Sequence, residues 1–315
     1  MSGTALPTSE PTRPTASPPL GRSVALIAAD IKLSHSVFAL PFAVLGTFLA
    51  AASDGRRPRV GEFVLIVVCM VTARTVAMAV NRWADAAIDA GNPRTSRRAV
   101  PSGRLPRSAM AAAAAVCAGL FVAACGGFWL AYGNPWPVVL SPAVLAFLGG
   151  YSFAKRFTWL CHAWLGLALA ASPVAAALAI HPAALQRPDI WLLAAMVACW
   201  VAGFDVIYAL QDVTVDRAAG LNSLPARFGA ERALWVSRAL HAAALAALVM
   251  LTLQSPWLGV LFGGGVALVA ALLALEHALV WGSRTHHLNM AFFTVNGVVS
   301  VVLGALGVVE VWRAL

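Results

Sequence analysis

DIWLLAAMVACWVAGFDVIYALQDVTVD, residues 189–216, joins a long apolar run to a stripe of carboxylates. No charged residue lies between Asp189 and Asp205, and a membrane-spanning helix needs about 20 such mostly apolar residues. A carboxylate at the edge of hydrocarbon is costly unless it meets a cation. The segment therefore predicts a transmembrane helix that ends in a charged site.

The rest of the chain has the same apolar character. Of its 315 residues 60% are hydrophobic and 11% are charged, and the mean hydropathy is +0.80. A soluble domain carries about 25% charged residues. A soluble chain of this size would have to bury nearly every helix on all sides. The composition indicates an all-α, polytopic membrane protein.

Apolar runs of spanning length predict about nine transmembrane helices. Their approximate ranges are 24–51, 61–83, 108–131, 135–153, 159–180, 189–210, 233–253, 257–281 and 289–312. Residues 1–22 are rich in Pro, Ser and Thr and lack the apolar core of a signal peptide, so we expect a disordered tail before a transmembrane domain at 23–315.

Basic residues predict the orientation. Sixteen of the 22 Lys and Arg fall on one predicted side, and five fall on the other: Arg56, Arg57, Arg59, Arg187 and Arg313. The positive-inside bias then places the N-terminus in the cytoplasm and the chain in the cytoplasmic (inner) membrane. Loop orientation and anionic lipids also account for the net charge of +9, and we find no nucleic-acid-binding module.

A first acidic segment, NRWADAAID at 81–89, follows the second predicted helix. Asn81, Asp85 and Asp89 are four residues apart, which predicts three oxygen ligands along one helix face. The chain has only 13 acidic residues, so their concentration here and in the segment quoted above is not generic solubilising charge.

A second acidic segment, 205–216, carries Asp205, Tyr208, Asp212 and Asp216 in a similar stripe. Both segments are predicted at the same side of the membrane, and the similar loops NPRTSRRAVPSG and RAAGLNSLPARFG suggest an internal duplication. Two such stripes favour Mg²⁺, which takes few carboxylates and completes its shell with water and phosphate oxygens.

Cations are predicted beside these carboxylates. YSFAKRF supplies Tyr151, Lys155 and Arg156 at a helix end, and Arg74 lies two turns before Asn81. This mixture of charges suits a multiply charged anion such as diphosphate bound together with metal. Alternatively, Lys155 and Arg156 are snorkelling interface residues.

Taken together, NRWADAAID, NPRT, YSFAK, DVIYALQD with VTVD, and the number of helices resemble the UbiA superfamily of intramembrane aromatic prenyltransferases, over about residues 31–297. IKLSHSVFALPF, ARTVAMAVNR, SLPARFG and LNMAFFTVNG resemble the branch of futalosine-route menaquinone synthesis more than the 4-hydroxybenzoate branch. In the latter, the first motif commonly has Asp and Arg where this chain has Arg82 and Ala86.

The resemblance implies about nine helices around a central intramembrane active site. It also implies Mg²⁺-dependent transfer of a polyprenyl group from polyprenyl diphosphate to a ring carbon of a hydroxylated aromatic carboxylate. The acceptor would be of the 4-hydroxybenzoate or 1,4-dihydroxy-6-naphthoate type, in ubiquinone or menaquinone biosynthesis. The implied roles are metal binding by Asn81, Asp85, Asp89, Asp212 and Asp216, catalysis by Asp205, Tyr208 and Lys155, and binding of diphosphate or acceptor by Arg74, Arg82, Tyr151, Lys155, Arg156 and His35.

Other functions remain open at this point. A related enzyme could prenylate a haem, chlorophyll or lipid-headgroup precursor, and intramembrane carboxylates also mark cation-coupled transporters. An assembly factor without catalysis would leave the two acidic segments unexplained. The sequence specifies neither the isoprenoid length nor the oligomeric state.

Several remaining polar residues have simpler interpretations. The five cysteines lie in apolar runs without metal-ligand spacing and are predicted to be free hydrophobic residues. His162, His277, His286 and His287 also lack ligand spacing, and Glu276 is predicted to be a charge at the membrane interface.

Overall fold

The computed structural model describes residues 19–31, 38–280 and 294–315, and within these ranges it contains helices and no strand. The α-helices are α1 (Leu20–Asp30), α2 (Leu40–Ser53), α3 (Val60–Ala84), α4 (Ala86–Ala90), α5 (Arg107–Tyr132), α6 (Trp136–Gly150), α7 (Cys161–Ile180), α8 (Pro188–Tyr208), α9 (Val213–Ala218), α10 (Leu224–Phe228), α11 (Ala230–Gln254), α12 (Val260–Leu279) and α13 (Asn296–Ala314). Short 3-10 helices are η2 (Tyr151–Arg156), η3 (Pro182–Gln186) and η4 (Ala209–Asp212).

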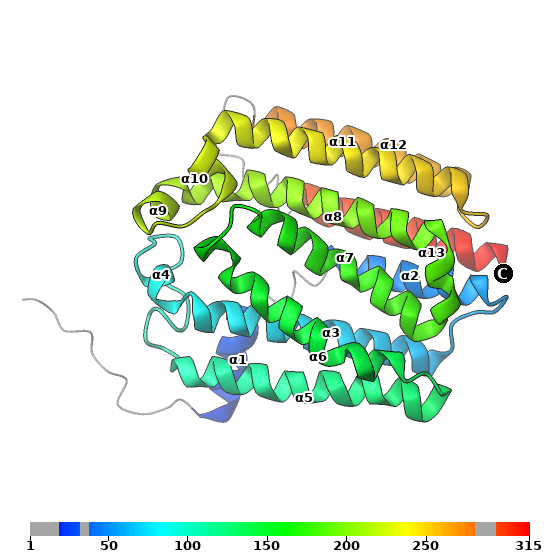
Figure 1. Ribbon diagram of the computed structural model, residues 1–315, viewed down its shortest axis with the longest axis horizontal. Helices are drawn as coiled ribbons and strands as arrows, with labels where there is room; N and C mark the ends of the chain where they lie inside the picture. The colour runs from blue at the N-terminus through cyan, green and yellow to red at the C-terminus, as the bar shows by residue number, and fades with distance from the viewer. Residues whose placement is uncertain (1–18, 32–37, 281–293) are drawn as a thin grey trace, which may run out of the picture.

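Long apolar helices run side by side along one axis (Figure 1). Among the described residues, eight helical segments are long and apolar enough to cross a membrane, and α2 is a shorter apolar helix of 14 residues. The prediction of an all-α, polytopic membrane protein with about nine spans is confirmed.

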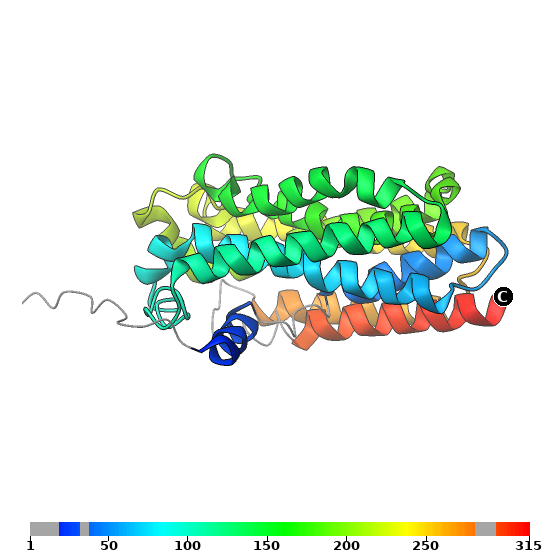
Figure 2. The same ribbon diagram turned by 90° about the horizontal axis from the view of Figure 1, so that it is seen from below.

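The beginning of the chain differs from the prediction of one helix over 24–51. Helix α1 starts inside the predicted tail and ends at Asp30, and α2 starts at Leu40. Figure 2 shows α1 lying outside the bundle that contains α2. Pro41 explains part of this break, because it lacks an N–H and its fixed φ suits the first turn of a helix better than a helix interior.

Helix α8 is the centre of the bundle. It packs against both α7 and α11. In the span that begins with α8, 67% of the most apolar stretch is buried inside the protein, whereas in the span formed by α6 and η2 the buried share is 17%. A Cβ atom on Gly166 of α7 would collide with the Ala198 carbonyl of α8, so glycine allows these two helices to approach closely. This contact fixes the first half of α7 against the middle of α8.

Short elements α4, η2, α9 and α10 gather at one end of the bundle, on the left in Figure 1, which we call the site end. Each follows an apolar helix in the chain, or lies in the connection after one. The breaks in regular helix therefore occur where the acidic segments begin to interact with polar loops.

Two predictions about polar residues have different outcomes. The five cysteines are free, as predicted. Glu276 is fully buried and accepts a hydrogen bond of 2.7 Å from Asn296 Nδ2, so the prediction of an interface charge is wrong. Packing of α12 against α13 encloses this carboxyl group inside the bundle.

Candidate active site

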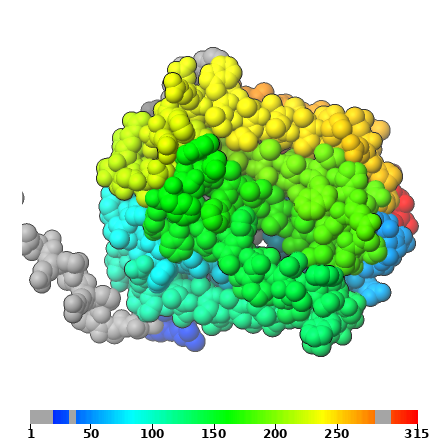
Figure 3. Space-filling model, viewed as in Figure 1, coloured from blue at the N-terminus to red at the C-terminus, as the bar shows by residue number. Residues whose placement is uncertain are grey.

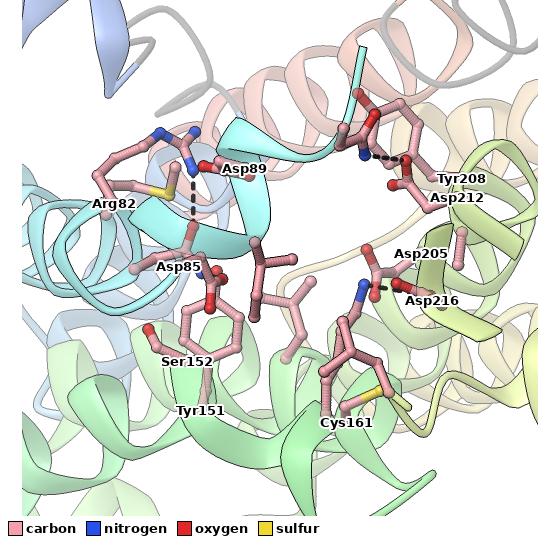
Figure 4. Close-up of a pocket in the computed structure, with 18 of the residues that line it drawn as sticks. Arg82, Asp85, Asp89, Tyr151, Ser152, Cys161, Asp205, Tyr208, Asp212 and Asp216 are labelled. Carbon is pink, nitrogen blue, oxygen red and sulfur yellow. Dashed lines mark hydrogen bonds and ion pairs between the residues drawn. The ribbon is translucent and has the colours of Figure 1, made fainter. Parts of the chain in front are cut away.

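A cavity of about 270 Å³ lies at the site end, between α3, α4, η2, α7, α8, η4 and α9. Figure 4 shows the carboxylates of the two acidic segments on opposite sides of it. His35 lies outside the described residues. All other predicted site residues line the cavity: Arg74, Asn81, Arg82, Asp85, Asp89, Tyr151, Lys155, Arg156, Asp205, Tyr208, Asp212 and Asp216.

The first acidic segment is a helix with one interruption. Helix α3 ends at Ala84, and Asp85 forms the junction with α4. The Asp85 N–H still donates to the Asn81 carbonyl at 2.9 Å, and the Asp89 N–H donates to the Asp85 carbonyl at 2.8 Å. The predicted four-residue helical spacing is therefore kept across the junction, and the three side chains line one cavity.

The second acidic segment is interrupted more strongly. Asp205 and Tyr208 belong to α8, Asp212 ends the 3-10 helix η4, and Asp216 lies in α9. The stripe predicted from regular helical spacing is thus carried by three successive elements. Asp212 and Asp216 are nearly buried, with exposed fractions of 7% and 3%.

Arg94, in the loop after the first acidic segment, contacts the second acidic segment. Its Nη2 and Nε donate to Asp212 at 2.6 and 3.1 Å, and its Nη1 donates to the Tyr208 hydroxyl at 3.0 Å. Asn92 Nδ2 also donates to Asp212, at 3.0 Å. Arg94 and Asn92 belong to the NPRT motif, and neither was predicted to be a site residue. The signal in the sequence that could have identified them is their position just after Asp89, a predicted metal ligand.

The carboxylates of the first segment also have basic partners. Arg156 donates to Asp85 at 2.8 Å, and Arg98, another residue missed by the sequence analysis, donates to Asp89 at 2.6 Å. Burial raises the pKa of Asp85 above its ordinary value, although the Arg156 charge acts in the opposite direction. The Arg156 charge therefore does not fully offset the cost of burying the ionised Asp85 carboxylate.

The donor set fits a hard divalent cation. Asp216 Oδ2 is buried without a hydrogen-bond partner among the described residues, and the Lys155 ammonium lies 3.8 Å away. Within the described part of the chain, no three His, Cys, Asp or Glu side chains converge on one point. Mg²⁺ does not need such a cage, because it is commonly held by one or two carboxylates with water and phosphate oxygens.

Asp205 has a different kind of partner. His162 Nδ1, at the start of α7, lies 2.6 Å from Asp205 Oδ2, and the backbone N–H of Leu224 donates to His162 Nε2 at 3.2 Å. This pair was not predicted from the sequence. The two residues are 43 positions apart, and only the packing of α7 on α8 brings them together.

An apolar cavity of about 320 Å³ adjoins the polar one, between α3, α5, α6 and α7. Figure 3 shows the molecular surface hollowed near the green segments of α6 and α7. The two cavities share part of their lining: Arg74, Met78, Tyr151, Leu165 and Leu169. A molecule with a charged head and a hydrocarbon tail could therefore occupy both.

Comparison with known proteins decides the family. The sequence profile of the UbiA prenyltransferase family matches residues 39–298. The chain belongs to the UbiA prenyltransferase family. The predicted family and the prediction of a prenyltransferase are confirmed.

Sequence relatives of this UbiA-family chain include bacterial 4-hydroxybenzoate octaprenyltransferases. That of Chromohalobacter salexigens is 30% identical over 240 residues, which cover 75% of this chain and 76% of the relative. That of Saccharophagus degradans is 31% identical over 263 residues, which cover 81% of this chain and 82% of the relative.

Solved structures share the fold of this UbiA-family chain. The apo structure of a UbiA homolog from Aeropyrum pernix K1 matches with a TM-score of 0.77 and 31% identity, over 88% of this chain and 98% of that one. A UbiA homolog from Archaeoglobus fulgidus bound to DMAPP and Mg²⁺ matches with a TM-score of 0.67 and 18% identity, over 92% and 99% of the two chains. The second likeness concerns the fold alone.

Proposed function

We propose that the chain transfers a polyprenyl group from polyprenyl diphosphate to a ring carbon of a hydroxylated aromatic carboxylate. The acceptor is of the 4-hydroxybenzoate or 1,4-dihydroxy-6-naphthoate type, in ubiquinone or menaquinone synthesis. The observation that carries the proposal is the junction of a highly charged cavity with an apolar one at Arg74 and Tyr151. The names of the relatives and the ligands of the Archaeoglobus fulgidus structure support the same substrate classes.

The diphosphate group is assigned to the polar cavity. Its oxygens can replace carboxylates as partners of Arg94, Arg98 and Arg156, which leaves the carboxylates available to a cation. The ligands for Mg²⁺ are Asn81, Asp85, Asp89, Asp212 and Asp216. When bound, Mg²⁺ supplies charge neutralisation for the leaving diphosphate.

Side chains of the polar cavity then assist the reaction. Lys155, Arg156 and Arg74 stabilise negative charge on the diphosphate as the allylic C–O bond breaks. An electron-rich ring carbon attacks the allylic cation, and loss of the ring proton restores aromaticity. Asp205 orients or deprotonates the acceptor hydroxyl, with Tyr208 beside it.

Acceptor binding and water exclusion involve other parts of the site. Arg156 or His35 binds the acceptor carboxylate, and Arg82 contributes to the positive lining. Apolar residues such as Leu165, Val201 and Phe204 complete the wall and limit the access of water to the cation. The prenyl tail occupies the apolar cavity, where the lining is almost entirely hydrocarbon.

We propose the following placement in the cell. The chain is integral to the cytoplasmic membrane, with the site end and the N-terminus in the cytoplasm. The distribution of basic residues supports this orientation, because the Arg-rich loop 92–107 lies at the site end.

Product analysis tests this function. Membranes containing the chain receive Mg²⁺, a polyprenyl diphosphate, and either 4-hydroxybenzoate or 1,4-dihydroxy-6-naphthoate, and products are measured by mass spectrometry. A prenylated product that disappears with EDTA and returns with Mg²⁺ supports the proposal and names the acceptor. Absence of product with both acceptors, in a folded preparation, overturns the assigned acceptor class.

A further inference from the structure

His162 lies one layer behind the polar cavity. Its side chain is 3% exposed, whereas the Asp205 side chain is 22% exposed and lines the cavity. His162 is not among the residues that line this cavity. Any effect of His162 on chemistry must therefore act through Asp205.

Hydrogen bonding determines the state of the imidazole ring. The Leu224 N–H can only donate, so His162 Nε2 must present its lone pair at 3.2 Å. The ring proton then lies on Nδ1 and points at Asp205 Oδ2, 2.6 Å away. His162 is thus a neutral donor with a fixed tautomer, and it holds one carboxylate oxygen while the other remains available to the cavity.

The surrounding structure holds this ring in place. Leu224, the first residue of α10, is 5% exposed, and Ser223 before it is fully buried. Asn222 donates its backbone N–H to the Lys155 carbonyl at 2.8 Å, which ties the same loop to η2. The start of α10 therefore holds the Nε2 side of the His162 ring, and Asp205 of α8 contacts its Nδ1 side.

We propose that His162 is a positioning residue, which fixes the orientation of the Asp205 carboxylate toward the hydroxyl of the aromatic acceptor. This inference rests on the proposed function and adds a residue to it. A carboxylate that was free to rotate would spend much of its time away from the acceptor, and a correctly placed partner avoids this loss. The metal ligands are separate groups, so diphosphate binding should not depend on His162.

Two variants separate the two hydrogen bonds. His162→Asn keeps an N–H donor near the position of Nδ1 but loses the acceptor for Leu224. His162→Gln keeps an acceptor near the position of Nε2 but loses the donor to Asp205. Kinetic constants are measured for acceptor and for prenyl diphosphate in membranes, together with the thermal stability of each purified variant.

The positioning role predicts unequal effects. His162→Gln should lower kcat or kcat/KM for the acceptor about 10- to 100-fold, the range for a lost hydrogen bond to a charged group, with the diphosphate KM unchanged. His162→Asn should stay within about threefold of the unsubstituted chain, because its donor remains. Equal losses in both variants, or losses that follow thermal stability, would mean that His162 is only a structural tie and would overturn the proposal.

A spectroscopic measurement does not depend on the choice of acceptor. In ¹⁵N-histidine-labelled protein, the signal that His162→Asn removes should show Nδ1 protonated and Nε2 unprotonated, and Asp205→Asn should shift its Nδ1 resonance. The opposite tautomer, or no response to Asp205→Asn, overturns the proposal. If this signature is present but no aromatic acceptor is prenylated, the proposed function fails and the positioning role falls with it, while the hydrogen-bonded pair stands.

Discussion

The two acidic segments are alike in sequence but differ in how their carboxylates are held. In the first segment, Asp85 and Asp89 each pair with one arginine, and Asp85 also accepts a hydrogen bond of 2.8 Å from Asn81 Nδ2. In the second, Asp212 accepts hydrogen bonds from two nitrogens of Arg94 and from Asn92. Asp212 therefore accepts more hydrogen bonds than either carboxylate of the first segment.

The loops that follow the two segments differ as well. The loop after the first segment supplies Arg94 and Arg98 to carboxylates of both segments. The loop after the second supplies backbone groups that anchor η2 and His162. Similar sequence patterns therefore have different roles: the first loop supplies positive charge to the carboxylates, and the second holds η2 and His162 in place through backbone hydrogen bonds.

The largest expected effect is the loss of a carboxylate from either segment. Asp85→Ala and Asp212→Ala should each lower turnover on the order of 10³-fold, because each removes a proposed Mg²⁺ ligand and leaves an arginine unpaired. Product formation by mass spectrometry measures the loss, and size-exclusion behaviour in detergent checks the fold.

Asp54→Ala is the matched control for these two variants. Asp54 is an aspartate paired with Arg56 after α2, far from the cavity, and its side chain is 39% exposed. The turnover of the Asp54→Ala variant should equal that of the unsubstituted chain. Retained activity in Asp85→Ala but not in Asp212→Ala would limit the proposed metal site to the second segment.

A smaller effect is expected from substitution of Arg94, which joins the loop after the first segment to Asp212 and Tyr208 of the second segment. Arg94→Ala should raise the KM for prenyl diphosphate about 10- to 100-fold, because a charged, bidentate donor is lost from the cavity. Arg94→Lys should recover only part of this loss, since an ammonium cannot reproduce the fork of a guanidinium. Initial rates at varied prenyl diphosphate measure both variants.

Arg97 supplies the control within the same loop. It is exposed and does not line the cavity, so Arg97→Ala should leave the KM for diphosphate unchanged. Equal effects of Arg94→Ala and Arg97→Ala would show that the loop contributes only general positive charge, which would remove the proposed distinction between the two loops.

Most of the fold could be predicted from sequence because each spanning helix is a local apolar run. Helices α3, α5, α7, α8, α11 and α12 begin and end within a few residues of the predicted ranges. The break between α1 and α2 was missed, because residues 24–51 are apolar enough to pass as one helix and Pro41 was not used as a helix start. Composition alone does not register such breaks.

The site was predictable where it depends on local spacing and not where it depends on packing. Asp85 and Asp89 were found because four-residue spacing survives the junction of α3 and α4. The pair of Arg94 with Asp212 spans 118 positions, so it exists only after α3 and α8 have been placed in the bundle.

The smallest expected effect concerns stability without substrate or metal, and it tests the difference between the two segments directly. A raised pKa at Asp85 means that its ionised form is disfavoured by folding. This penalty is present above the ordinary carboxyl pKa and is relieved as the pH falls through the raised value. Asp85→Asn should therefore increase the melting temperature at neutral pH, and the increase should shrink as the solution is acidified.

Asp212→Asn should have the opposite effect on melting temperature. The neutral amide cannot accept the bidentate pair from Arg94, and it leaves that guanidinium without its carboxylate partner. Thermal unfolding of both variants in EDTA-containing detergent measures the contrast. A decrease of equal size in both variants would show that Asp85 and Asp212 are held equally tightly, and the proposed difference between these two carboxylates would have to be abandoned.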